Sequence, residues 1–253
     1  MRKSLWIVIA VAAVLVLGGL LFERNERTFS SDGEEGDSED AGTDSYAAPT
    51  EAPAPLLAPG QSITYNFDND SPGGTPTKFH SARTGQGTEG KWVVMADPTA
   101  PSKPNVVAQT SADSTDYRFP LLIADDGSFR DLELSVKFKA VSGNVDRAGG
   151  LVFRLKDGNN YYVVRANALE DNYRLYHVVD GRRRQFAGAN FKVASGEWHE
   201  LKIGCVGNKI ICYYDGQKKI EATDETFKDP GKIGLWTKAD SVTYFDDLRV
   251  VAK

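Results

Sequence analysis

The sequence has few of the residues that carry covalent or metal chemistry. Its 253 residues include two cysteines, two methionines and three histidines. No Cys-x-x-Cys or His-x-x-x-His pair occurs, so the common zinc-ligand spacings are absent. No Gly-x-Ser-x-Gly motif occurs, so the nucleophile elbow of the α/β-hydrolases is absent as well. These absences argue against a zinc enzyme, a disulfide-rich scaffold and a serine hydrolase of that kind.

Basic residues are missing from a long stretch near the start of the chain. Residues 28–60 contain no Lys or Arg but eight Asp or Glu. Residues 1–60 together have 4 basic and 10 acidic side chains (4 − 10 = −6), whereas residues 61–253 have 26 and 25 (26 − 25 = +1). The formal charge of −5 therefore belongs to the first 60 residues. Because the remainder is nearly neutral, we expect no nucleic-acid partner.

The chain begins with a segment that resembles a membrane anchor. Leu5–Phe22 is an unbroken run of 18 apolar and Gly residues that follows Arg2 and Lys3. As a helix it would span about 27 Å, close to the thickness of a bilayer core. A cleaved signal peptide is the alternative, but the run is long for one and passes directly into Glu23 without a small-x-small site. We expect residues 1–27 to anchor the protein, with the following domain extracytoplasmic, or secreted if the segment is cleaved.

Residues 28–60 have the composition of a spacer. Their first half is acidic and rich in Ser and Gly, which leaves little apolar surface to bury. Their second half is rich in Pro and favours extended polyproline geometry. We expect a disordered linker. A cation-binding segment is the alternative, and the irregular spacing of its carboxylates disfavours it.

Residues 61–253 have a strand pattern throughout. Turn pairs such as Asp180-Gly181 and Asp215-Gly216 separate short β-rich runs. Within these runs, apolar and polar residues alternate, as in Leu132–Lys139. Many short strands with hairpin connections predict an all-β fold, a two-sheet antiparallel jelly-roll sandwich. The clearest predicted strands are Leu132–Ala140, Gly150–Lys156, Tyr161–Ala168, Tyr173–Val179, His199–Val206, Lys209–Tyr214 and Ser241–Val251.

Three segments resemble a known family. SGEWHELKIGCVGNKIICYYDGQ and GKIGLWTKADSVTYFDDLRV are similar to the second half of concanavalin A-like, laminin-G-like jelly rolls. AGGLVFRLKDGNNYYVVRANALEDN is similar to the middle strands of bacterial 3-keto-disaccharide hydrolase domains, a family-16-glycosidase-like group. The resemblance extends over residues 61–253 and implies two curved sheets whose concave face often binds sugars. It does not by itself assign an activity to this chain.

The carboxylates do not follow a glycosidase pattern. Glycoside hydrolysis usually needs two carboxyl groups on either side of the bond. The cluster Glu221, Asp224 and Glu225 breaks the alternation of a strand, so we expect it to be a solvated rim. Where the resemblance implies an acid on the middle strand, this chain has Val163, and Arg165 takes a polar position. Carbohydrate binding is therefore favoured; a 3-keto-disaccharide hydrolase or lyase and a cell-surface protein-interaction domain are the alternatives.

Several polar and aromatic side chains fit a sugar-binding groove. Sugars stack on aromatic rings and form hydrogen bonds with planar polar groups. Alternation places Arg165 and Asn167 on one face of their strand, whereas Trp236 has the alternative of packing in the core. We expect Arg182-Arg183-Arg184 to be a solvated loop, with anionic-polymer binding as the alternative. The residues predicted to bind a glycan are Arg154, Arg165, Asn167, Tyr176, Trp236 and Lys238.

Acidic residues near both ends of the domain suggest a structural calcium ion. Asp68 lies in a first strand expected over Tyr65–Asp70, and Asp246 and Asp247 lie in the last strand. The jelly-roll resemblance implies that the terminal strands lie side by side, and Ca²⁺ prefers carboxylate and carbonyl oxygens. We expect the three acids to be metal ligands. Ordinary strand-end acids are the alternative.

The two cysteines lie on either side of a predicted hairpin turn. A two-residue loop at Gly207-Asn208 pairs Cys205 with Ile210 and leaves Cys212 diagonal to it. A shift of one residue would bring the thiols opposite each other. The sequence is compatible with a disulfide between the two cysteines and also with two buried free thiols. We expect the domain to be a monomer.

Overall fold

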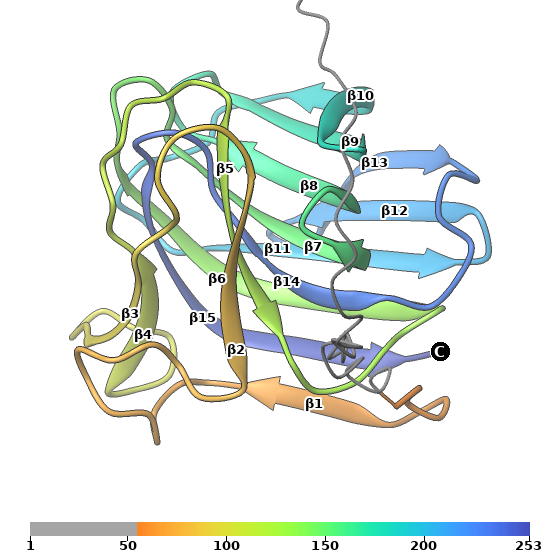
Figure 1. Ribbon diagram of the computed structural model, residues 1–253, viewed down its shortest axis with the longest axis horizontal. Helices are drawn as coiled ribbons and strands as arrows, with labels where there is room; N and C mark the ends of the chain where they lie inside the picture. The colour runs from red at the N-terminus through yellow and green to blue at the C-terminus, as the bar shows by residue number, and fades with distance from the viewer. Residues whose placement is uncertain (1–54) are drawn as a thin grey trace, which may run out of the picture. The chain divides into compact units, whose positions relative to one another are not determined.

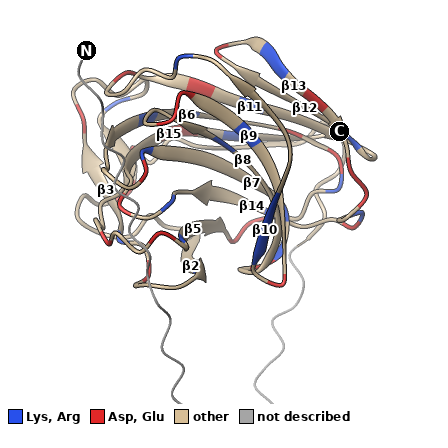
Figure 2. Cartoon of the chain, turned by 90° about the horizontal axis from the view of Figure 1, so that it is seen from above, with Lys and Arg blue, Asp and Glu red and all other residues tan. Residues whose placement is uncertain are grey.

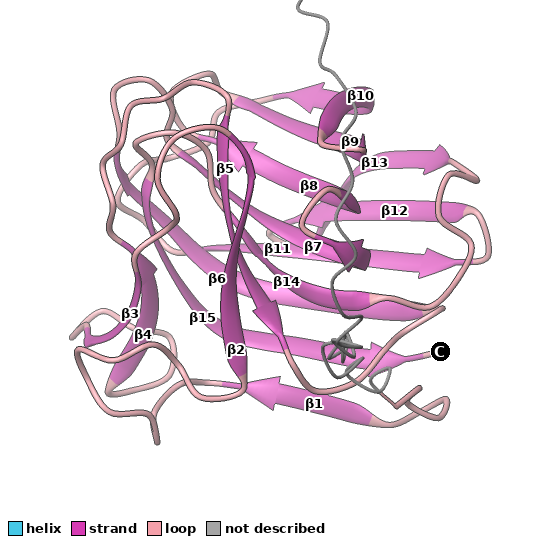
Figure 3. Cartoon of the chain, in the orientation of Figure 1, coloured by secondary structure: helices cyan, strands magenta, loops and turns pink. Residues whose placement is uncertain are grey.

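The computed structural model describes residues 55–253. The predicted anchor and most of the predicted linker lie outside the described residues. Within residues 55–253, no helix is long and apolar enough to cross a membrane. Figure 3 shows this part of the chain as strands and loops.

The described residues form two sheets whose strand pairings are all antiparallel (Figure 1). The eight-stranded sheet has the order β13 (Gln217–Thr223), β12 (Lys209–Tyr214), β11 (His199–Val206), β6 (Leu132–Ser142), β15 (Val242–Ala252), β4 (Asn105–Gln109) and β3 (Trp92–Ala96), with β1 (Ser62–Tyr65) also paired to β15. The seven-stranded sheet has the order β10 (Arg182–Asn190), β9 (Asn172–Val179), β8 (Asn160–Asn167), β7 (Ala148–Asp157), β14 (Lys232–Trp236), β5 (Arg118–Ala124) and β2 (Phe79–Gly85). The predicted all-β two-sheet antiparallel sandwich is confirmed.

All seven strands predicted from the sequence are present, as β6, β7, β8, β9, β11, β12 and β15. Two of the other strands lack a clear two-residue alternation. Strand β5 contains Pro120 and is buried at every position, and β10 begins with three arginines. The prediction of a solvated loop at Arg182–Arg184 is therefore wrong, because these residues pair with β9.

The domain begins before the predicted boundary at residue 61. Pro55 accepts a hydrogen bond from the backbone N–H of Ser128 (2.9 Å), and Leu57 donates to the carbonyl of Ser128 (3.2 Å). Gly60 donates to the carbonyl of Ala252 (2.9 Å). Residues 55–60 thus run along the sandwich rather than continuing the linker.

The inner core lies between the two sheets and follows the predicted alternation. On β8, Tyr162, Val164 and Ala166 face this core, whereas Tyr161 and Val163 face outward from the sandwich. Burying side chains of this size removes enough apolar surface to contribute about 1.5–3 kcal/mol each. The face assignment made from the sequence is confirmed for this strand.

The outer face of the seven-stranded sheet is also packed, because the sheet curls over itself. In Figure 1, β2 and β5 run across the other strands of this sheet. Thr84 on β2 donates to the carbonyl of Gly158 in the β7–β8 turn (2.5 Å), and Phe119 on β5 stacks on Trp236 of β14 (5.4 Å between ring centres). We call the enclosed apolar cluster the outer core; it contains Phe119, Leu121, Ile123, Ala148, Val152, Leu155, Tyr161, Val163, Tyr176, Val178 and Trp236.

Both cysteines are free and buried. The predicted hairpin register is confirmed, because Cys205 pairs with Ile210 across the Gly207-Asn208 turn. Cys212 pairs instead with Ile203 and Ile220. Of the two alternatives, a disulfide or two buried thiols, the structure has two buried thiols.

Candidate functional site

Five charged side chains gather at one end of the seven-stranded sheet. Asp116 lies just before β5, Asp146 just before β7, Glu170 between β8 and β9, and Lys238 just after β14. In an antiparallel sheet these four positions belong to the same end of the strands. Arg165, near the end of β8, joins them. We call these five residues the charged cluster.

Lys238 links two of the acids. Its Nζ lies 2.7 Å from Oδ1 of Asp116 and 3.0 Å from Oδ2 of Asp146. Burial opposes the charge of Lys238, but the hydrogen bond that it donates to Asp116 and the charge of Asp146 raise its pKa above the usual value. The lysine therefore stays positive at neutral pH and holds together two loops far apart in the sequence.

Asp146 is almost completely buried, with 1% of its surface exposed. Its Oδ1 accepts a hydrogen bond from Nδ2 of Asn167 (2.8 Å). Burial raises the pKa of Asp146, although Lys238 and Arg165 partly oppose this effect. A carboxyl held in this way favours its protonated form more than an ordinary aspartate does.

The guanidinium group of Arg165 donates hydrogen bonds to three side chains, and the residue is 4% exposed. Its Nη2 donates to Oε2 of Glu170 (3.0 Å) and to the hydroxyl of Tyr176 (3.1 Å), and its Nη1 donates to Asn172. The Nε of Arg165 is buried without a partner among the described residues. Although burial opposes it, hydrogen bonds from Asn172 and Arg165 hold the pKa of Glu170 below its usual range.

The structure thus brings together four of the residues predicted for glycan binding: Arg165, Asn167, Tyr176 and Lys238. Sequence reasoning missed Asp146, Glu170 and Asp116. These acids lie in loops, where no alternation marks a face. They can be recognised only in the folded structure, where three separate loops meet at one end of the sheet.

Trp236 lies in the outer core and is fully buried. Its indole stacks on Phe119, and the guanidinium of Arg183 lies 5.6 Å from its ring centre. The core alternative for this residue holds, and its ring face is not available for stacking on a sugar. The exposed aromatic nearest in sequence to the charged cluster is Tyr117, which is 42% exposed and directly follows Asp116.

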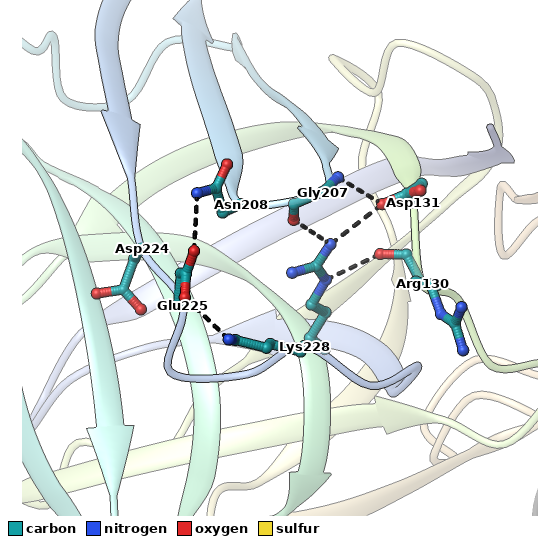
Figure 4. Close-up of a pocket in the computed structure, with 8 residues that line it drawn as sticks. Arg130, Asp131, Gly207, Asn208, Asp224, Glu225 and Lys228 are labelled. Carbon is teal, nitrogen blue, oxygen red and sulfur yellow. Dashed lines mark hydrogen bonds and ion pairs between the residues drawn. The ribbon is translucent and has the colours of Figure 1, made fainter.

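Arg154 lies outside the charged cluster, beside a separate pocket of about 270 Å³. Its guanidinium donates to the carbonyls of Arg130 (2.8 Å), Phe227 (2.8 Å) and Gly207 (2.7 Å), and lies 3.2 Å from Asp131. These bonds connect β7 to the loop before β6, the β11–β12 turn and the loop between β13 and β14. Figure 4 shows that acidic side chains lie on opposite sides of this pocket. Because all these partners belong to the protein itself, Arg154 has a structural role here.

Asp224 in this pocket is more enclosed than the predicted solvated rim. Its Oδ1 accepts a hydrogen bond from the hydroxyl of Tyr162 (2.5 Å), and its Oδ2 lies 3.3 Å from Nδ1 of His177. Glu225 nearby pairs with Lys228 (2.9 Å). The expectation of a solvated rim is therefore wrong for Asp224, whose side chain is 15% exposed.

The predicted calcium ligands lie around one loop near the terminal strands. Asp68 accepts a hydrogen bond from the backbone N–H of Asn105 (3.0 Å), and Asp246 accepts one from that of Ser102 (2.9 Å). Asp247 instead lines a surface hollow with Lys137. Within residues 55–253, no three His, Cys, Asp or Glu side chains come together as a metal site would require. The calcium site stays a prediction.

The family is shown by comparison with known protein families. A model described as "3-keto-alpha-glucoside-1,2-lyase-like domain" matches residues 67–251. The chain belongs to this family. The resemblance inferred from the sequence is thereby confirmed. No match was found among curated proteins.

Three solved structures of sugar-related proteins are similar to this chain. The carbohydrate-binding module CBM66 from Bacillus subtilis is 20% identical, with 70% of this chain and 96% of that one covered and a TM-score of 0.57. The β-glucanase of Bacillus licheniformis is 16% identical, with coverages of 77% and 99% and a TM-score of 0.52. Domain 4 of an arabinanase from Geobacillus stearothermophilus, solved with arabinotriose, is 14% identical, with coverages of 75% and 90% and a TM-score of 0.48. The first two establish the concanavalin A-like β-sandwich.

Proposed function

We propose that this domain binds a glycan at the charged cluster. The observation that carries the proposal is the pair of buried charges, Asp146 and Arg165, at the end of a curled sheet. Burying charges is costly unless partners compensate them, and here Lys238 compensates Asp146 while Glu170 compensates Arg165. Lys238 also pairs with Asp116, so the exposed carboxylates of Asp116 and Glu170 connect the buried charges to the surface.

The chemistry of the cluster suits a neutral sugar. Its three acids and two bases give a net charge of −1, so no strong field selects a charged ligand. Carboxylates and a forked guanidinium can form the several directed hydrogen bonds that sugar hydroxyls need. Tyr117, directly after Asp116, offers an exposed ring for stacking.

A glycan array with the full chain tests this proposal. The variants Asp116→Asn and Glu170→Gln change exposed carboxylates, so the fold should be retained. We expect each to weaken glycan binding by about tenfold or more, the loss that follows from a hydrogen bond to a charged group. Glu225→Gln, beside the other pocket, is the matched control and should bind like the wild type. Equal binding by all variants would place the sugar elsewhere.

Cleavage of a 3-keto-α-glucoside is a second candidate, favoured by Asp146. The family description names a 1,2-lyase. In a 3-keto sugar the C2 proton is α to the carbonyl, so a base can remove it while the glycosidic oxygen leaves C1 and a C1=C2 double bond forms. A buried carboxylate with a raised pKa is a stronger base than an ordinary aspartate. Asp146 would take the proton, and Lys238 would stabilise the developing negative charge.

This second candidate is tested with a 3-keto-α-glucoside that carries a chromogenic leaving group. Release of the leaving group by the wild type, and its loss in Asp146→Asn, would establish catalysis. Binding without release would leave the domain as a carbohydrate-binding module. Exchange of the C2 proton with solvent, followed by NMR, detects the first step even when the bond does not break.

We also propose that residues 5–22 hold the domain at the outer surface of a membrane. The support is the apolar run and the spacer composition that follows it. Fractionation of cells that express the full chain tests this. We expect the protein in carbonate-washed membranes, with the domain cleaved by protease added to intact cells. Recovery in the soluble fraction or protection from protease would contradict the proposal.

A further inference from the structure

A second polar site lies at the other end of strand β9. A pocket of about 400 Å³ is lined by His177, Val179, Asp180, Arg182 and Arg184. The β9–β10 pairing places Arg184 opposite His177 and Arg182 opposite Val179. Because alternate residues of a strand share a face, both guanidinium groups lie on the same side of β10. Figure 2 shows β10 as a prominently basic strand.

Neither arginine is neutralised within residues 55–253. The structure gives no ion pair or side-chain hydrogen bond to Arg182 or Arg184. Neighbouring arginines differ, since Arg174 donates to Asn190 (2.6 Å) and Arg183 packs on aromatic rings. Two adjacent, unpaired guanidinium groups form a local excess of positive charge on a domain that is otherwise close to neutral.

His177 places its imidazole ring in the pocket, and contacts with two neighbouring side chains hold the ring in position. Its ring stacks on Phe186 (5.5 Å between centres), and its Nδ1 lies 3.3 Å from the carboxylate of Asp224. Asp180 is the acid that lines the pocket itself, at the turn between β9 and β10. The lining therefore holds two cations, one acid and an oriented imidazole.

We propose that this pocket binds the oxyanion groups of an acidic polysaccharide. Arginine matches sulfate and carboxylate oxygens because its planar fork donates two parallel hydrogen bonds. The pocket is lined by exposed strand residues, which suits one segment of a polymer passing over the surface. Sulfate esters and uronate carboxylates share the required chemistry.

The net charge of the domain favours a polysaccharide over a nucleic acid. Nucleic-acid binders carry basic surfaces that neutralise many phosphates. Here the excess is confined to two arginines, and residues 61–253 have a net charge of only +1. The charged cluster lies at the opposite end of β9, whereas the hydroxyl of Tyr117 reaches the β9–β10 turn through its hydrogen bond to Gly181.

Affinity measurements at several salt concentrations test the proposal on the full chain. The probes are dextran sulfate, polygalacturonate, neutral dextran and single-stranded DNA. We expect one or both acidic polysaccharides to bind and neutral dextran not to bind at this site. The double variant Arg182→Gln/Arg184→Gln should weaken that binding at least tenfold at low salt and lower the slope of log K against log salt by about 1–2, as expected when two cationic contacts are lost.

The control is a second double variant that removes equal charge elsewhere, Arg130→Gln/Lys103→Gln. Both residues are exposed, so the variant should keep the wild-type slope. Comparison of dextran sulfate with polygalacturonate separates sulfate from carboxylate recognition. The proposal is overturned if neither polysaccharide binds, if both double variants lose binding equally, or if DNA binds as tightly as the polysaccharides.

Discussion

The guanidinium group of Arg183 lies 4.5 Å from the centre of the Phe119 ring. Arg183 belongs to β10 at one edge of the seven-stranded sheet, and Phe119 to β5 near the other edge. Their contact closes the curl of the sheet over the outer core. The closure is reinforced by Tyr117, whose hydroxyl donates to the carbonyl of Gly181 (2.9 Å) and accepts from the N–H of Arg183 (3.1 Å). The outer face of this sheet is therefore a packed interior.

Arg183 should stabilise the domain through packing more than through its charge. Its Nη1 is buried without a hydrogen-bond partner, and burial lowers its pKa. Arg183→Ala removes the contacts with three rings, so we expect a loss of about 1–3 kcal/mol in the free energy of unfolding. Arg183→Met keeps most of the covering volume and should lose less than about 1 kcal/mol. Urea unfolding checks both values; an equal loss in the two variants would mean that the charge is essential.

Asp146 should make stability depend on pH in a defined direction. Burial raises its pKa in the folded protein above 3.8, the ordinary value. Such a group stabilises the fold fully below about pH 3.8, and this contribution is lost as pH rises through the folded pKa. Asp146→Asn removes the titration, so the variant should gain stability relative to the wild type between about pH 4 and about pH 7.

The measurement compares the free energy of unfolding of the two proteins across that range. Other groups titrate in both proteins, so the difference isolates Asp146. Lys238 keeps Asp116 as a partner in the variant, which limits the loss of its ion pair. A difference that is constant with pH would show that the folded pKa of Asp146 is not raised.

The sequence predicted those parts of the fold that depend on local alternation. Strand β8 shows this, because Tyr162 and Val164 face the inner core as expected while Arg165 faces outward. Strand β5 could not be predicted in this way, since it is buried at every position and carries a proline. Its place depends on the curl of the sheet, which is a property of the whole fold.

The charged cluster was only partly predictable for the same reason. Arg165 and Lys238 could be predicted because each is a charged residue within or directly after an otherwise apolar strand. Asp146 gave no such signal, because its partners Asn167 and Lys238 come from other loops and strands. Trp236 could not be assigned from the sequence, since an aromatic side chain in a β-sandwich can serve packing or sugar stacking, and the structure buries it in the outer core.

Calcium removal tests the predicted metal site directly. We expect EGTA to lower the melting temperature of the full chain and Ca²⁺, but not Mg²⁺, to restore it, because Ca²⁺ accepts irregular sets of oxygen ligands. Asp68→Asn should abolish this response, whereas Asp131→Asn, an acid outside the terminal strands, should retain it. A melting temperature unchanged by EGTA would mean that Asp68 and Asp246 act only as acceptors of the hydrogen bonds from Asn105 and Ser102 and hold no calcium ion.

The two thiols should be unreactive until the domain unfolds. Burial raises the pKa of Cys205 to about 11 and that of Cys212 still further, so almost no thiolate forms near neutral pH. We expect a thiol reagent such as DTNB to label neither cysteine in the native protein and to label both in urea. The variants Cys205→Ala and Cys212→Ala should each leave one reactive thiol in urea and should be destabilised by about 1–2 kcal/mol through loss of buried volume. Failure of the wild type to react in urea without reductant, with recovery of two thiols after reduction, would instead reveal a disulfide.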